Sequence, residues 1–156
     1  MGSYYDNTSN CGSHGFRLSN RAYTNIDVPE SLGAVPGTTT AAAIDPQGDI
    51  VGNYTDSSFV FHGFLLSHST FSAIPDIPAP GASTFPLGMN PQGDIVGAAF
   101  SVTPCCGFLL SHGTVSIIDV PGSSLTVPYG IDPQGDIVGF YQDSNGNQHG
   151  FLIRQN

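Results

Sequence analysis

Short apolar runs separated by Gly, Pro, Asn and Asp residues follow one another along the whole chain. The pattern is clearest over residues 38–78. There it predicts four strands, at 38–44, 49–54, 62–67 and 70–74. The turn at 45–48 carries Pro at its second corner and Gly at its end, as type I turns do. No window shows the sustained apolar period of a helix, and short strands with closely spaced turns are typical of all-β domains.

The same pattern is repeated along the chain. The sequence Pro-Gln-Gly-Asp-Ile-Val-Gly occurs at Pro46–Gly52, Pro91–Gly97 and Pro133–Gly139. A Gly-Phe pair recurs with it and is preceded by His14, His62, Cys106 or His149. Repeats of this length are typical of blades, coils and arrays. We therefore interpret the chain as a single repeat domain with units at 1–37, 38–81, 82–122 and 123–156, the first and last of them partial.

The repeat predicts an all-β protein of tandem four-stranded units, arranged as consecutive blades like those of a β-propeller. A β-trefoil is the alternative, because three periods of this length also match its threefold barrel. The first unit lacks its first predicted strand and the last unit lacks its fourth. Unpaired strand edges are templates for pairing with other chains. The pattern therefore predicts self-association, as a homo-oligomer or a filament.

The charge of the chain limits the kinds of molecule that it can bind. The chain has no Lys, three Arg and twelve acidic residues, for a net charge of −9. Nucleic-acid binding is excluded, because no basic patch is present to neutralise phosphates. No apolar stretch approaches the roughly 18 residues that span a bilayer, so we expect no membrane insertion. The surface relies on uncharged polar residues, as in many extracellular β proteins, and the first residues do not form a signal peptide. We expect a piece of a secreted or cell-surface protein.

The repeated phrases resemble the HAF-type extracellular repeat of bacteria. The segments that carry the resemblance are Gly130–Asp132, Gly135–Gly139, His149–Leu152 and Ile118–Gly122. The resemblance covers nearly the whole chain, although Cys106 replaces the His in one unit and residues 74–78 are degenerate. It implies a secreted or surface-exposed bacterial protein with propeller-like four-stranded blades. It implies no activity.

Two residue types suggest metal sites. His14, His62 and His149 occupy equivalent positions and could meet at one ion, but Cys106 replaces His without other change. We expect each His to make a structural hydrogen bond to neighbouring backbone instead. The repeated acids are weak calcium candidates, since their spacing falls short of a calcium loop and Asn90 replaces one of them. These candidates are Asp45, Asp49, Asp94, Asp132 and Asp136. No cofactor is expected, with calcium as the alternative.

Three cysteines, Cys11, Cys105 and Cys106, are the disulfide candidates. Cys11 and Cys105 fall in the same loop of two different units. A bridge from Cys11 to Cys105 or Cys106 requires these loops to lie on one face within about 7 Å. The alternative is that all three remain unpaired in loops.

Four aromatic residues, Tyr5, Tyr54, Phe100 and Tyr141, recur near the end of the second strand and are candidates for stacking on sugar rings. Packing between blades explains them equally well. The chain contains no known catalytic motif, so we do not expect an enzyme. The sequence favours a non-catalytic extracellular scaffold or binding module, with itself, a carbohydrate or a surface protein as partner. The alternatives are a lectin-like carbohydrate-binding module and a secreted glycan-active enzyme.

Overall fold

The computed structural model describes residues 1–7, 12–100 and 106–155. They form an all-β protein of four antiparallel sheets, so the all-β part of the predicted fold is confirmed. Sheet A contains β1 (Gly2–Tyr5), β2 (Ser13–Ser19) and β3 (Ala22–Ile26). Sheet B contains β4 (Thr40–Ile44), β5 (Ile50–Thr55), β6 (Phe61–Ser67) and β7 (Thr70–Ala73). A short 3-10 helix, η1 (Glu30–Leu32), joins them.

The second half of the chain repeats this arrangement. Sheet C contains β8 (Ser83–Met89), β9 (Ile95–Phe100), β10 (Cys106–Ser111) and β11 (Thr114–Ile118). Sheet D contains β12 (Leu125–Ile131), β13 (Ile137–Gln142) and β14 (Gln148–Ile153). Strand pairing stays within the four sheets. The described residues therefore form neither the closed barrel that the trefoil alternative requires nor a closed ring of blades.

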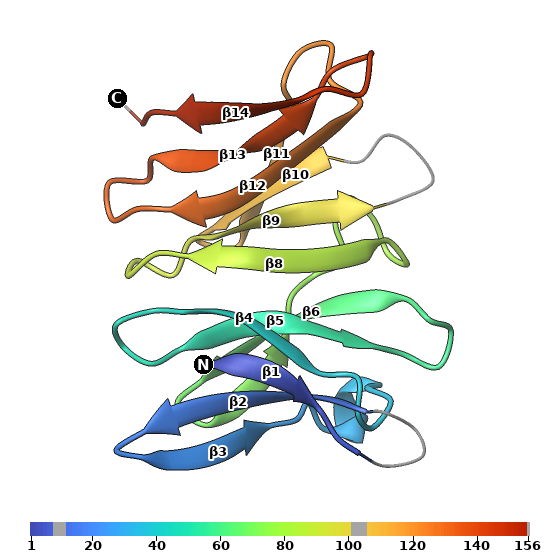
Figure 1. The fold of residues 1–156 in the computed structure, drawn as a ribbon, viewed down its shortest axis with the longest axis vertical. Helices are drawn as coiled ribbons and strands as arrows, with labels where there is room; N and C mark the ends of the chain where they lie inside the picture. Colours follow the sequence, from blue (N-terminus) through green and yellow to red (C-terminus); the bar gives the residue numbers. More distant parts are fainter. Residues whose placement is uncertain (8–11, 101–105, 156) are drawn as a thin grey trace.

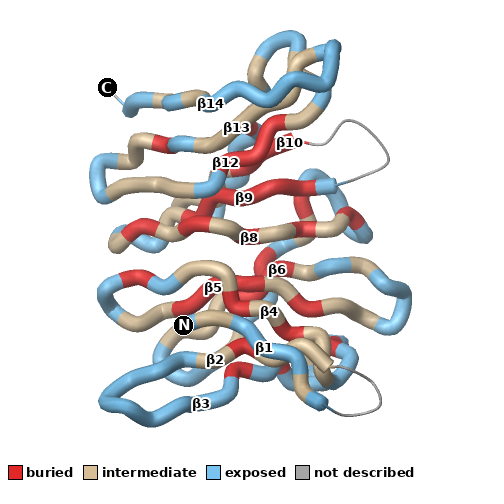
Figure 2. Tube along the Cα trace, viewed as in Figure 1, coloured by how far each residue is buried: buried red, intermediate tan, exposed pale blue. Residues whose placement is uncertain are grey.

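The sheets are stacked in chain order, each facing the next (Figure 1). We call the face towards the preceding sheet the backward face and the opposite one the forward face. Between sheets A and B, Ile26 packs with Ile50 and Phe64; between B and C, Val51 packs with Ile95 and Phe108. Thus Ile50 and Val51 face opposite sides, as expected for a sheet covered on both faces. Burial is greatest in the middle of the stack and falls towards sheets A and D (Figure 2).

Two repeated glycines allow close approaches of different kinds. A Cβ at Gly52 would overlap the Thr40 carbonyl oxygen and lie 2.8 Å from Cε1 of Phe64, both within sheet B. Beside it, the pairing of β4 with β5 shifts register between Ala41 and Ala43. At Gly63, by contrast, a Cβ would lie 2.9 Å from Cγ of Pro86 in sheet C. The His-Gly-Phe glycine thus brings neighbouring sheets together, whereas the glycine of the longer repeat accommodates an irregular first strand.

Candidate functional site

A histidine bridged by two aspartates lies at one end of the strands. In sheet B, His62 begins the buried part of β6, Asp56 follows β5 and Asp76 follows β7. His62 Nδ1 lies 2.7 Å from Asp76 Oδ1, and its Nε2 lies 3.1 Å from Asp56 Oδ2. The carboxylates also accept backbone hydrogen bonds, Asp56 from Ser58 and Val60, and Asp76 from Gly81. The imidazole therefore joins two loops to the central strand.

The electrostatics favour a protonated ring. Burial lowers the pKa of His62, but the hydrogen bonds and charges of Asp76 and Asp56 raise it more, so its pKa is above the ordinary value. The Val60 N–H and His62 together hold the pKa of Asp56 below its ordinary value. A doubly protonated imidazole donates from both nitrogens, which matches two carboxylate acceptors. The two carboxylates therefore favour the charged form of the imidazole.

The bridge recurs at His14 in sheet A, and His149 in sheet D makes one of its two contacts. His14 lies 2.7 Å from Asp27 Oδ1 and 3.3 Å from Asp6 Oδ2, and the hydrogen bond to Asp27 is the main cause of its raised pKa. His149 Nε2 lies 3.1 Å from Asp143 Oδ2 and, with Asn147, holds the pKa of Asp143 well below its ordinary value. The expectation of a hydrogen bond from each His was sound, but its partners are carboxylates and not backbone groups. Among the described residues no group of three or more His, Cys, Asp or Glu side chains is arranged to hold a metal ion.

An aromatic ring covers each of these histidines. Tyr4, Tyr54 and Tyr141 lie 5.3, 5.4 and 5.0 Å from the rings of His14, His62 and His149, centroid to centroid. Tyr54 is buried, and its hydroxyl donates to the Leu32 carbonyl at 2.9 Å. Burial of this phenol, with the nearby Asp76 and Asp56 charges, raises its pKa.

The register separates the four predicted aromatic candidates into two kinds. The partner of His14 is Tyr4, the partner of His62 is Tyr54, and the partner of Cys106 is Ala99. Tyr5 and Phe100 are therefore one residue beyond the positions of Tyr54 and Tyr141, and their predicted equivalence is wrong. Tyr5 is 77% exposed whereas Tyr54 is 3% exposed, so the four rings do not form one binding surface.

The predicted calcium residues lie in the turns before β5, β9 and β13. Asp45 Oδ1 accepts the Asp49 N–H at 2.9 Å, and Asp132 Oδ1 accepts the Asp136 N–H at 2.9 Å. Asn90 Oδ1 takes the same role towards Asp94, which explains why an amide can replace the acid. These acids, Asp45, Asp49, Asp94, Asp132 and Asp136, are distributed over three separate turns. Of the disulfide candidates, Cys106 is buried at the start of β10, and Cys11 and Cys105 lie outside the described residues.

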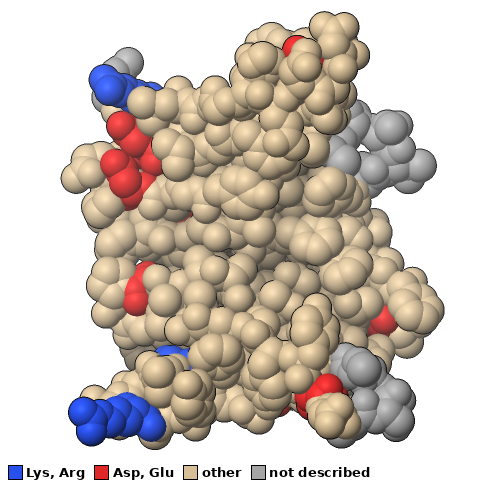
Figure 3. Space-filling model, in the orientation of Figure 1, with Lys and Arg blue, Asp and Glu red and all other residues tan. Residues whose placement is uncertain are grey.

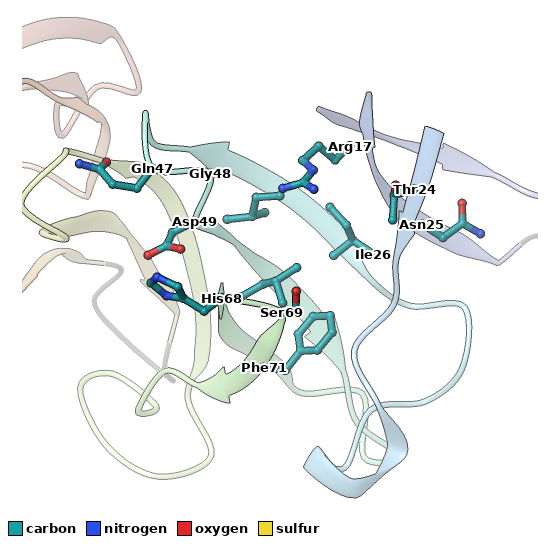
Figure 4. Close-up of a pocket in the computed structure, with 12 residues that line it drawn as sticks. Arg17, Thr24, Asn25, Ile26, Gln47, Gly48, Asp49, His68, Ser69 and Phe71 are labelled. Atoms are coloured by element: carbon teal, nitrogen blue, oxygen red, sulfur yellow. The ribbon is translucent and has the colours of Figure 1, made fainter. Parts of the chain in front are cut away.

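A cavity of about 320 Å³ opens between sheets A and B, at the opposite end of the strands from the histidine bridges. Arg17 and Thr24 line it from sheet A, and Asp49, His68 and Phe71 line it from sheet B. The Arg17 guanidinium reaches between the sheets, and Asp49 and His68 lie together on the other side (Figure 4). Apolar side chains, among them Ile26 and Leu66, line the interior. Of the described residues, none places a carboxylate within 4.0 Å of Arg17.

Beside this cavity, a serine contacts an aspartate and a histidine of the cavity wall, but in an order that does not suit nucleophilic catalysis. Ser67 Oγ donates to Asp49 Oδ2 at 2.8 Å and lies 2.9 Å from His68 Nδ1. In a Ser-His-Asp triad the imidazole lies between the other two groups; here the serine does. Ser111 and His112 repeat the contact at 2.9 Å in sheet C. The cluster closes a tight turn and presents polar groups to the cavity.

Sequence reasoning missed both the bridges and the cavity. The signal for the cavity was present: Arg17 occupies the position held by Leu65, Leu109 and Leu152 in the other units, as the strand registers show. Comparison with family models, curated proteins and solved structures finds no match for this chain. No helix among the described residues is long and apolar enough to cross a membrane.

Proposed function

We propose that this chain is a non-catalytic extracellular repeat module of the HAF type, and that it acts as a scaffold by stacking its end sheets against other copies of itself. The sheets then act as propeller-like blades, and the stack of blades continues from one molecule into the next. The observation that carries it is that apolar residues on the two end faces are more exposed than the residues at equivalent positions inside the stack.

The forward face of sheet D is the first of these surfaces. Val138 is 50% exposed, although its counterparts Val51 and Val96 are fully buried against the following sheet. Leu152 pairs with Val138 across β13 and β14 and is also half exposed. The face is thus built with the residues that form the interfaces within the molecule. Burying a Val or Leu side chain gains about 1.5–3 kcal/mol, so this face favours a partner sheet.

The backward face of sheet A is the second. Phe16 and Tyr23 pack with their ring centroids 5.5 Å apart and their planes at 58°. Phe64 and Phe71, their counterparts in sheet B, lie 5.6 Å apart at 59° and cover sheet A. Tyr23 is nevertheless 71% exposed. Sheet A therefore presents to solvent a copy of the surface that sheet B buries.

One end face is a forward face and the other is a backward face, which is the pair of faces that meets at each internal interface. Forward-face residues meet backward-face residues at every contact within the molecule, so we expect the face of sheet D to meet the face of sheet A of a second copy. Such a head-to-tail contact gives a ring if its rotation closes and a filament if it does not. Figure 3 views the stack from the side, where charged side chains are scattered; the two end faces lie at the bottom and top of that view.

A non-catalytic role is supported by the repetition of the polar clusters. The His–Asp bridges and the Ser–His turns recur from unit to unit, whereas an active site needs one asymmetric arrangement of nucleophile, base and stabilising groups. Light scattering over a dilution series tests the scaffold role. We expect the mass to rise with concentration above that of a 16.2 kDa monomer. A mass that stays at the monomer value at every concentration would overturn the proposal.

A further inference from the structure

The cavity between sheets A and B contains a residue that departs from the repeat. Arg17 lies there at a position where the other units have a leucine. Leu65 and Leu109 occupy this position at the next two interfaces and pack against the buried clusters there. Arg17 replaces that contact with a guanidinium beside the apolar residues Ile26 and Ile50. A sheet interface gains nothing in packing from this exchange, because the cation must stay hydrated or paired. The substitution is therefore better explained by a ligand that pairs with the guanidinium.

The groups around Arg17 restrict what that ligand can be. A guanidinium binds a carboxylate through two parallel hydrogen bonds, and Arg17 is the only arginine among the described residues that line the cavity. Asp49 on the opposite wall would repel a second anionic group but accepts hydrogen bonds from hydroxyls. The net charge of −9 also disfavours polyanions. These charges fit a ligand with one carboxylate at one end and hydroxyl groups at the other.

The shape of the cavity adds a third requirement. Phe71 and Leu66 provide an apolar surface between the charged walls, and the C–H face of a sugar ring packs against such a surface. The volume of about 320 Å³ is large enough for one sugar ring. We propose that this cavity binds a hexuronate unit, with its carboxylate on Arg17, hydroxyls on Asp49 and the Ser69–His68 turn, and its ring against Phe71.

The site is independent of the stacking surfaces. It lies between sheets A and B, whereas the proposed assembly uses the outer faces of sheets A and D. Val138→Asp should therefore disturb assembly and leave hexuronate binding unchanged. Failure of one proposal can thus be told from failure of the other.

Titration calorimetry with glucuronic acid and galacturonic acid, at low ionic strength, is the direct test. We expect saturable binding of a hexuronate, with glucose at least tenfold weaker because it lacks the carboxylate. Cyclohexanecarboxylate should also be weaker, since it has the carboxylate but no hydroxyl groups. Arg17→Leu restores the residue of the other units and should fold, while weakening hexuronate binding about tenfold to hundredfold. Arg154→Leu, at an exposed arginine beyond β14, is the matched control and should bind like the wild type.

Amide chemical shifts locate the ligand. On titration with the hexuronate, the largest changes should fall on Arg17, Asp49 and Phe71. No binding of either hexuronate to the wild type would overturn the proposal. Equal affinity for glucose, undiminished binding by Arg17→Leu, or shifts confined to other residues would do the same.

Discussion

His62 Nδ1 lies 2.7 Å from Asp76 Oδ1, and the same 2.7 Å separates His14 Nδ1 from Asp27 Oδ1 one unit earlier. Each pair joins a central strand to the segment that leads into the next sheet. Asp119 takes the corresponding place in the third unit, where Cys106 stands instead of the histidine. Asp76 has an imidazole partner whereas Asp119 has none among the described residues, so the effect of this partner on stability can be measured within one protein.

We expect Asp76→Ala to destabilise the protein more than Asp119→Ala. The first substitution removes an acceptor from His62 and from the Gly81 N–H, which costs about 1–3 kcal/mol. The second removes a 3.2 Å hydrogen bond that Ser123 donates at the surface, and should cost less than about 1 kcal/mol. Urea denaturation at pH 6 measures both free energies of unfolding. Equal costs would show that the bridge contributes nothing beyond loop packing.

The bridges also predict how stability depends on pH. The pKa values of His14 and His62 are raised by folding, so their contribution is complete below their unfolded pKa and is lost as pH rises through the folded value. The pKa values of Asp56 and Asp143 are lowered, so their contribution is present above their unfolded pKa and is lost as pH falls through the folded value. Stability should therefore be greatest between about pH 4 and 6.5.

Urea midpoints measured from pH 3 to 9 would show this maximum. His62→Gln should reduce the fall in stability on the alkaline side, because one of the two raised pKa values is removed. His112→Gln, which removes an exposed imidazole outside the bridges, should leave the profile unchanged. A profile that rises continuously to pH 9 would contradict the protonated state assigned to the bridges.

Gly52 gives a prediction about packing within a sheet. Gly52→Ala would force a Cβ against the Thr40 carbonyl and the Phe64 ring, both of which are held by neighbouring strands. We expect a loss of about 4 kcal/mol or more, or failure to fold. At Gly130 a Cβ would meet only Cγ2 of Val138, at 3.3 Å, so Gly130→Ala should cost far less. Thermal unfolding of the two variants compares them, and similar melting temperatures would refute the steric explanation.

Local repeats determined what could be predicted from sequence. Identical phrases located the strands, and the adjacent Ile50 and Val51 correctly indicated a sheet covered on both faces. The partners of His62 were missed because Asp76 lies in a degenerate copy of a repeated segment and Asp56 in a variable loop, and no sequence pattern shows that both reach the same imidazole. Tyr5 was misplaced because β1 pairs through Tyr4 with His14, a register that only strand pairing reveals. Alignment of the units shows that Arg17 replaces a leucine. The sequence does not show that these leucines pack between sheets, so the cavity could not be predicted.

The stacking interface makes the sharpest prediction, because its two faces can be blocked separately. Val138→Asp places a charge on the forward face of sheet D, and Leu18→Asp places one on the backward face of sheet A, where Leu18 is 47% exposed. Each variant keeps one intact face, so each alone should be monomeric. Mixed in equal amounts, they should form a one-to-one complex through the two unmodified faces. Ser144→Asp, in the exposed β13–β14 loop, should assemble like the wild type. Sedimentation velocity distinguishes these species. Assembly by either variant alone would show that two like faces meet, because each variant keeps one face intact. A mixture that stays monomeric while the wild type assembles would also contradict a head-to-tail contact.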